Sequence, residues 1–179
     1  MLPCRYCATD FFGQIFGGTA GATQAKANVK SEFAKRFTSK RDEAAFQPRN
    51  DAEIEEAIKR WEGYIHPRAL DFFRTQEQLR EVLKLLAEGT DKNEDPVLGD
   101  DHKCVHWYGR VTDDPAQAGM RILMPGDLAQ SVTHVNRVLA YMFAGDDSFE
   151  ELMKLPWEPF RMCCGNQLCV HLAHISQAV

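Results

Sequence analysis

Two stretches within the first hundred residues repeat hydrophobic side chains at the spacing of an amphipathic helix. Asn50 and Glu53 match a capping box at the start of the first stretch. Thr75 and Gln78 occupy the same positions before the second stretch, and Gly89 follows it as a stop signal. The apolar stripes comprise Ile54, Ile58, Trp61 and Ile65 in the first helix and Leu79, Val82, Leu83 and Leu86 in the second. The pattern predicts a mainly helical first part of the chain.

The second part of the chain has a different pattern. Residues 103–111 and 120–124 are short β-prone runs separated by a polar loop, which predicts a hairpin. A helix that ends at Gly145 should follow, then a short helix over 148–156 and a Cys-rich turn with a last short helix within 157–179. The buried face of the longer helix is expected to contain Leu128, Val132, Val135, Val138, Leu139 and Met142. The fold class is therefore expected to be α+β, with a ββα arrangement in the second part.

Residues 90–103 are the best candidate for a linker, because they are polar, acidic and interrupted by Pro96. This places a boundary near residue 100. We expect an N-terminal arm and helical region over 1–99 and a separate domain over 100–179.

Composition narrows the function classes. The chain has 179 residues, of which 44% are hydrophobic and 26% charged, as in an ordinary globular protein. Its longest apolar runs, such as 138–144, are too short to span a bilayer. The net charge of −5 gives the whole chain no general affinity for polyanions, so nucleic-acid contact would need a local basic patch.

One such patch is present in the sequence at residues 26–41, which contain six Lys or Arg against the single Glu32. Organelle presequences have this composition, so a mitochondrial or other organellar location is one hypothesis. A solvated basic helix or arm is another, and contact with RNA or an acidic protein surface is a third.

The cysteines are spaced like metal ligands rather than like a disulfide framework, and no apolar secretory signal opens the sequence. We therefore expect an intracellular, reducing compartment. Cys164, Cys169 and His174 have the spacing C-x4-C-x4-H, with a Gly-Asn turn between the thiols. Cys104 is the isolated upstream cysteine and completes a predicted Cys3His zinc site. Cys163 competes with Cys164, but adjacent side chains on a strand point in opposite directions.

Cys4 and Cys7 have C-x-x-C spacing without a second pair to complete a metal site, so their role stays open.

These motifs resemble the zinc-binding branch of the His-Me finger (HNH) nucleases, such as homing endonucleases of that type. The resemblance covers roughly residues 103–176. It rests on Cys104, Trp107 and Gly109 of a C-x-x-W-x-G pattern, on Arg137-Val-Leu-Ala-Tyr141, and on the knuckle formed by Cys164-Gly165-Asn166, Cys169-Val170 and His174-Ile175.

The same resemblance implies that catalytic parts are missing. The family's general-base histidine lies two residues before the first knuckle cysteine, and Met162 occupies that position. A thioether cannot accept the proton of the attacking water. The family's catalytic-metal ligand lies about two turns beyond the zinc histidine, and this sequence stops at Val179, five residues after His174. We therefore expect residues 100–179 to form a degenerate HNH-like zinc-binding domain that is not an enzyme.

The expected function is that of a structural or accessory subunit in a larger protein or ribonucleoprotein assembly. Residues 100–179 carry six Lys or Arg against ten Asp or Glu, whereas a domain that grips phosphates should be basic. Two alternatives stay open. One is an active, divalent-metal-dependent DNA endonuclease with His171 or His106 as a relocated base. The other is a DNA-binding protein like the Smad proteins, whose DNA-binding domain shares the end of this knuckle.

Overall fold

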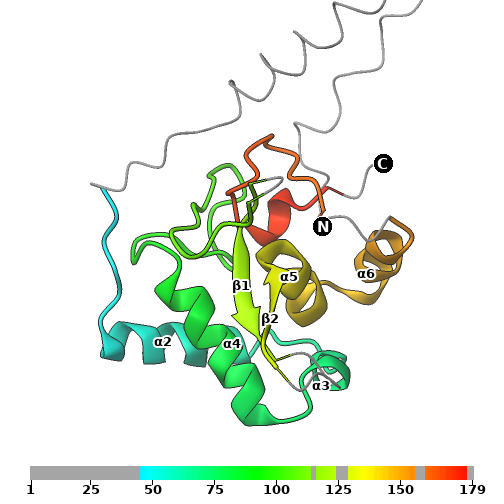
Figure 1. Ribbon diagram of the computed structural model, residues 1–179, viewed down its shortest axis with the longest axis horizontal. Coiled ribbons are helices and arrows are strands. Elements are labelled where there is room, and N and C mark those ends of the chain that lie inside the picture. Colours follow the sequence, from blue (N-terminus) through cyan, green and yellow to red (C-terminus); the bar gives the residue numbers. More distant parts are fainter. Residues whose placement is uncertain (1–44, 114–115, 124–128, 156–159, 177–179) are drawn as a thin grey trace, which may run out of the picture.

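The computed structural model describes residues 45–113, 116–123, 129–155 and 160–176. Cys4, Cys7 and the basic segment 26–41, for which the sequence analysis made predictions, lie outside these residues. Helices precede a β-hairpin and a further helix, which confirms the α+β fold class (Figure 1). The elements in chain order are α2 (Asp51–Glu62), α3 (Ala69–Phe72), α4 (Gln76–Glu88), β1 (Gly119–Ile122), β2 (Ser131–His134), α5 (Val135–Phe143), α6 (Asp146–Met153) and the 3-10 turn η2 (Leu172–His174).

Helices α2 and α4 begin at their predicted caps, and α4 ends before Gly89 as predicted. Helix α2 ends at Glu62, so Ile65, predicted as part of its apolar stripe, lies after the helix. The Asn50 side chain accepts a hydrogen bond from the Glu53 amide at 3.0 Å, and the Glu53 carboxylate accepts one from the Asn50 amide at 2.8 Å. Thr75 Oγ1 accepts from the Gln78 amide at 3.2 Å. These contacts satisfy backbone donors that a helix N-terminus otherwise leaves unpaired.

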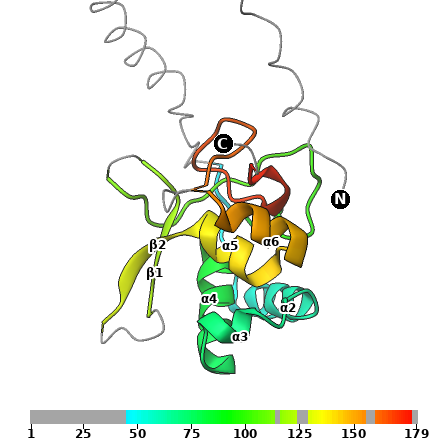
Figure 2. The same ribbon diagram turned by 90° about the vertical axis from the view of Figure 1, so that its right-hand side faces the viewer.

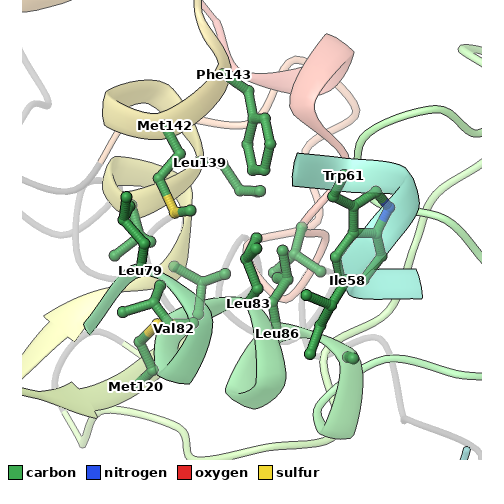
Figure 3. Packing of buried hydrophobic residues seen from close by; sticks show 14 of the residues in the cluster. Ile58, Trp61, Leu79, Val82, Leu83, Leu86, Met120, Leu139, Met142 and Phe143 are labelled. Atoms are coloured by element: carbon green, nitrogen blue, oxygen red, sulfur yellow. The ribbon is translucent and has the colours of Figure 1, made fainter. Parts of the chain in front are cut away.

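The hydrophobic core lies between α2, α4 and α5 (Figure 3). Ile58, Leu83 and Leu139 are each at most 1% exposed and come from the three helices in turn. Val170, next to the Cys-rich knuckle, belongs to the same cluster. Residues before and after position 100 therefore share one core, which fixes the knuckle relative to the helices.

The segment 90–103, predicted as a linker, packs against the helices in its first part, around Thr90 and Asp95, whereas residues 100–103 are exposed. Arg49 donates hydrogen bonds to the carbonyl oxygens of Ala87 and Thr90 at 2.9 and 2.8 Å. Asp95 Oδ1 accepts from Trp61 Nε1 at 2.9 Å, and the Thr90 side chain is fully buried. The polar composition of this segment indicated a solvent-exposed linker. Its polar groups can be buried because they form hydrogen bonds within the protein in place of hydrogen bonds to water.

The hairpin differs from the predicted one. β1 pairs antiparallel with β2, in a register that places Gly119 opposite His134 and Ile122 opposite Ser131. Residues 103–111, the predicted partner, contribute isolated bridges such as Val111 to Ala118. Figure 2 shows the hairpin projecting to one side of α4 and α5.

The helix predicted to contain Val132 begins three residues later, at Val135. Val132 lies in β2 and is 40% exposed. The β-branched pair Val132-Thr133 suits a strand, and pairing with β1 outweighs a helical period that the sequence also satisfies. Leu128 and Pro156 lie outside the described residues. The short helix α6 begins at Asp146 rather than at Ser148.

Across the described ranges, no helix is long and apolar enough to cross a membrane.

Candidate metal centre

The knuckle is built by a tight turn between its two cysteines. Gly165 has a φ of 75°, a left-handed conformation that glycine adopts at little cost, and its amide donates to the Met162 carbonyl at 2.9 Å. Asn166 then accepts from two amides: its carbonyl from Cys169 at 3.0 Å and its side-chain oxygen from Leu168 at 3.0 Å. The Gly-Asn pair thus turns the chain so that both thiols lie on one side, as the sequence predicts.

Cys104 reaches the knuckle through backbone pairing. The amide of Val170 donates to the carbonyl of Val105 at 2.8 Å, and that of Trp107 donates to Leu168 at 2.9 Å. His106 and Cys169 form an isolated antiparallel bridge between the same segments. The chain after Cys104 therefore runs alongside the knuckle, beside the orange and red segments of Figure 1.

The structure brings all four predicted ligands together. The ligand atoms of Cys104, Cys164, Cys169 and His174 lie within 4.8 Å of one another. His174 Nδ1 is 3.3 Å from the sulfur of Cys169 and 3.8 Å from that of Cys104. A tetrahedral zinc ion, about 2.3 Å from sulfur and about 2.0 Å from nitrogen, needs ligand atoms about 3.5–3.8 Å apart. The donor set fits zinc, and ligand atoms at most 4.8 Å apart would have to approach by at most about 1 Å to take up these distances. With all four residues bound, a tetrahedral ion would have no open position for a substrate.

Asp101 orients the histidine, a role that the sequence analysis missed. The Nε2 atom of His174 lies 2.8 Å from the Asp101 carbonyl oxygen, so the ring donates there and turns Nδ1 toward the sulfurs. No sequence signal could have identified this contact, because the acceptor is a backbone carbonyl that any residue would provide.

The environment of the thiols lets the cluster accept a cation. The Cys169 thiol donates a hydrogen bond to Cys164 and lowers the pKa of Cys164 to about 5. Burial, together with the negative charge at Cys164, raises the pKa of Cys104 to about 11. The hydrogen bond to Cys164 likewise raises the pKa of Cys169. An ion that binds here would displace the thiol protons of the cluster.

The other candidate residues occupy different surroundings. Met162 is 3% exposed, and its sulfur accepts from the Asn136 side-chain amide at 3.9 Å. His171 is 1% exposed, and its Nδ1 accepts from the Ala173 amide at 3.1 Å. His106 is about one-third exposed beside Glu94, whose carboxylate accepts from the His106 amide at 2.9 Å.

Cys163 is half-buried and lies outside the four-residue group. Its amide donates to the carbonyl of His174 at 2.8 Å, which ties the start of the knuckle to its end. Cys164 rather than Cys163 thus faces the other ligands, in agreement with the alternation expected from the sequence.

No protein-family model, curated protein or solved structure matches this chain. The geometry of the cluster therefore carries the functional argument.

Proposed function

We propose that the chain is a zinc-stapled, non-catalytic protein that serves as a structural or accessory subunit of a larger assembly. The observation that carries this proposal is the closed Cys3His set. Structural zinc sites have four protein ligands, whereas catalytic zinc sites keep one position for water or substrate. The arrangement of Cys104, Cys164, Cys169 and His174 corresponds to the first kind.

The ion would hold together segments that are distant in sequence. Cys104 and His174 are separated by 70 positions, and their segments are otherwise joined by backbone hydrogen bonds and by the packing of Val105 and Val170 in one core. Structural zinc contributes about 10–16 kcal/mol of apparent binding free energy in small modules at neutral pH. A contribution of that size would make the docking of the knuckle dependent on metal.

The absence of catalysis is supported by the position of Met162. In the HNH nucleases that the sequence resembles, the general base occupies the position of Met162. The side chain here is an uncharged, buried thioether that accepts a hydrogen bond from the Asn136 side-chain amide. His171 is buried with one ring nitrogen engaged, so it is poorly placed to meet a phosphodiester. The acidic balance of residues 100–179 also disfavours a nucleic-acid surface in that part of the chain.

The partner class is a protein surface, with the knuckle as a rigid unit and the basic segment 26–41 as the arm. Six Lys or Arg within that segment suit an acidic protein surface or an RNA. An organellar assembly is consistent with the same composition.

Two measurements on the purified full chain test the proposal. The first is metal content: we expect about one zinc ion per chain, released on denaturation. The second is incubation with supercoiled plasmid and magnesium or manganese, in which we expect no nicking. Zinc content near zero would refute the staple. Nicking that disappears in His171→Ala or His106→Ala would instead establish the nuclease.

The assembly is tested by native purification from the source cells, with Cys164→Ser as the matched variant. A defined set of proteins that accompanies the native chain and is lost with Cys164→Ser supports the subunit role. A chain that migrates alone in native form would contradict it.

A further inference from the structure

The four candidate ligands differ in solvent exposure. Cys169 and His174 are buried, at 1% and 4% exposure. Cys104 and Cys164 are half-buried. A small solute that approaches the cluster therefore meets the sulfurs of Cys104 and Cys164 before that of Cys169.

We propose that Cys104 and Cys164 form an oxidation site, at which a hydroperoxide converts the two metal-binding thiolates into a disulfide and releases the ion. The proposal rests on the proposed function, since it assumes that the cluster holds zinc. It adds that hydroperoxides regulate zinc binding at that site.

The reaction balances with the hydroperoxide as the two-electron oxidant. One thiolate attacks the terminal oxygen, the O–O bond breaks, and the alkoxide or hydroxide leaves as alcohol or water after protonation, giving a sulfenic acid. The second thiolate attacks that sulfur, the S–S bond forms, and the hydroxide leaves as water after protonation. Two thiolates lose one electron each, and the ion loses two of its four ligands.

Exposure favours Cys104 and Cys164 as the sulfurs that meet the oxidant first. All ligand atoms lie within 4.8 Å of one another, so a bond of about 2.05 Å requires the two sulfurs to approach by at most about 2.7 Å. Cys169 is 1% exposed, so a hydroperoxide reaches it last. The second thiolate needs no contact with the oxidant, so Cys169 competes with Cys104 for a sulfenic acid formed at Cys164, and the linked peptides distinguish the two bonds. Cys163 lies outside the group of atoms that face one another.

The disulfide would join the same two segments as the ion. Backbone hydrogen bonds of Val105 to Val170 and of Trp107 to Leu168 already align these segments. A covalent link between residues 104 and 164 keeps them aligned without metal. The oxidised chain is therefore folded without zinc. A reduced chain from which a chelator has removed zinc has neither the ion nor the disulfide to hold the knuckle in place.

The experiment uses the full chain with Cys4→Ser, Cys7→Ser and Cys163→Ser, so that the remaining cysteines are those of the cluster. The reduced, zinc-loaded protein is titrated with hydrogen peroxide or tert-butyl hydroperoxide. Zinc release is followed with a chromogenic chelator, disulfides by peptide mass spectrometry, and tertiary structure by near-UV circular dichroism. The comparison sample is the same protein treated with EDTA under reducing conditions.

We expect release of about one zinc ion per hydroperoxide consumed. We also expect a peptide that links Cys104 to Cys164, and a near-UV signal that survives oxidation but not EDTA. Zinc retained under excess oxidant, or a bond mainly between Cys164 and Cys169, would overturn the oxidation site while leaving the proposed function intact. A reduced protein without zinc would overturn the proposed function itself.

Discussion

The ring of His171 lies beside the ring of His174, with centroids 4.9 Å apart and an angle of 30° between the planes. His171 caps the η2 turn that carries the candidate ligand, because its Nδ1 accepts from the Ala173 amide at 3.1 Å. A Cβ added at Gly99 would lie 3.2 Å from His171 Nε2, so the loop before Cys104 packs closely on the same ring. The residue considered as a relocated base is therefore placed to hold the metal site.

His171→Ala should weaken zinc binding, because it removes both the cap of η2 and the ring behind His174. Groups that hydrogen-bond a ligating histidine change metal affinity by about 10- to 100-fold, and we expect about 10-fold here because the His171 ring packs beside His174. His171→Asn should recover part of this loss, since an asparagine side chain caps a helical turn well. Competition with a chelator of known affinity measures the change.

The control for that comparison is His102→Ala, which alters an exposed histidine near the same loop and should leave the zinc affinity unchanged. Equal affinities for His171→Ala and the unaltered chain would show that the ring does not support the site.

Cys104→Ser should reduce zinc affinity and loosen the knuckle, because it removes the ligand that comes from outside the C-x4-C-x4-H segment. The matched variant Cys163→Ser removes a thiol outside the group and should bind zinc normally. Metal content after dialysis and the cooperativity of chemical unfolding distinguish the two. If Cys163→Ser lost the zinc and Cys104→Ser kept it, the ligand assignment would be wrong.

Gly165→Ala should destabilise the zinc-loaded protein by about 1–2 kcal/mol, the cost of placing a Cβ in the left-handed conformation. The φ of 75° at this position requires that conformation. Gly165→Asn should cost less, since asparagine tolerates left-handed backbone better than alanine. Urea denaturation of the three proteins gives the order of stability, and alanine tolerated as well as asparagine would contradict the turn.

His134 should make the folded chain sensitive to mild acid. Burial, assisted by the nearby charge of Arg137, lowers the pKa of His134 below its usual value of 6.5. As the pH falls below 6.5, His134 becomes protonated in the unfolded chain but stays neutral in the folded chain until the lowered pKa is reached. The free energy of unfolding therefore decreases. The stability is complete above pH 6.5 and declines as the pH falls toward the lowered pKa.

His134→Gln removes the titrating imidazole. The variant should therefore lose less free energy of unfolding between pH 7.5 and 5.5 than the unaltered chain. Protonation of the candidate metal ligands affects both proteins alike, and the difference between their urea midpoints isolates His134. A variant as acid-sensitive as the unaltered chain would place the titration elsewhere.

Contacts that are local in sequence were predicted well. The caps of α2 and α4 depend on side chains three positions from the amides that they bind. The turn at Gly165 and Asn166 depends on neighbouring backbone atoms in the same way. Each such feature is stabilised within a few residues, so a sequence pattern contains most of the information.

The β-hairpin was predicted with the wrong partner strand, because strand pairing depends on contacts between residues that are distant in sequence. Val132 satisfies both a helical period and a β-branched strand pattern, and only pairing with β1 decides between them. The polar segment around Asp95 looked like a linker, because composition does not reveal that Trp61 and Arg60 lie opposite its carboxylate.

By itself, the sequence determined where α2 begins, where α4 begins and ends, the knuckle turn, and the four Cys and His residues that suit one zinc ion. The tertiary structure decided that Cys104 reaches the knuckle, that Asp101 orients His174, and that Cys104 and Cys164 are the sulfurs nearer the surface. Local features follow from backbone sterics and short-range hydrogen bonds, whereas proximity and exposure depend on which distant segments pack together to bury their apolar surface.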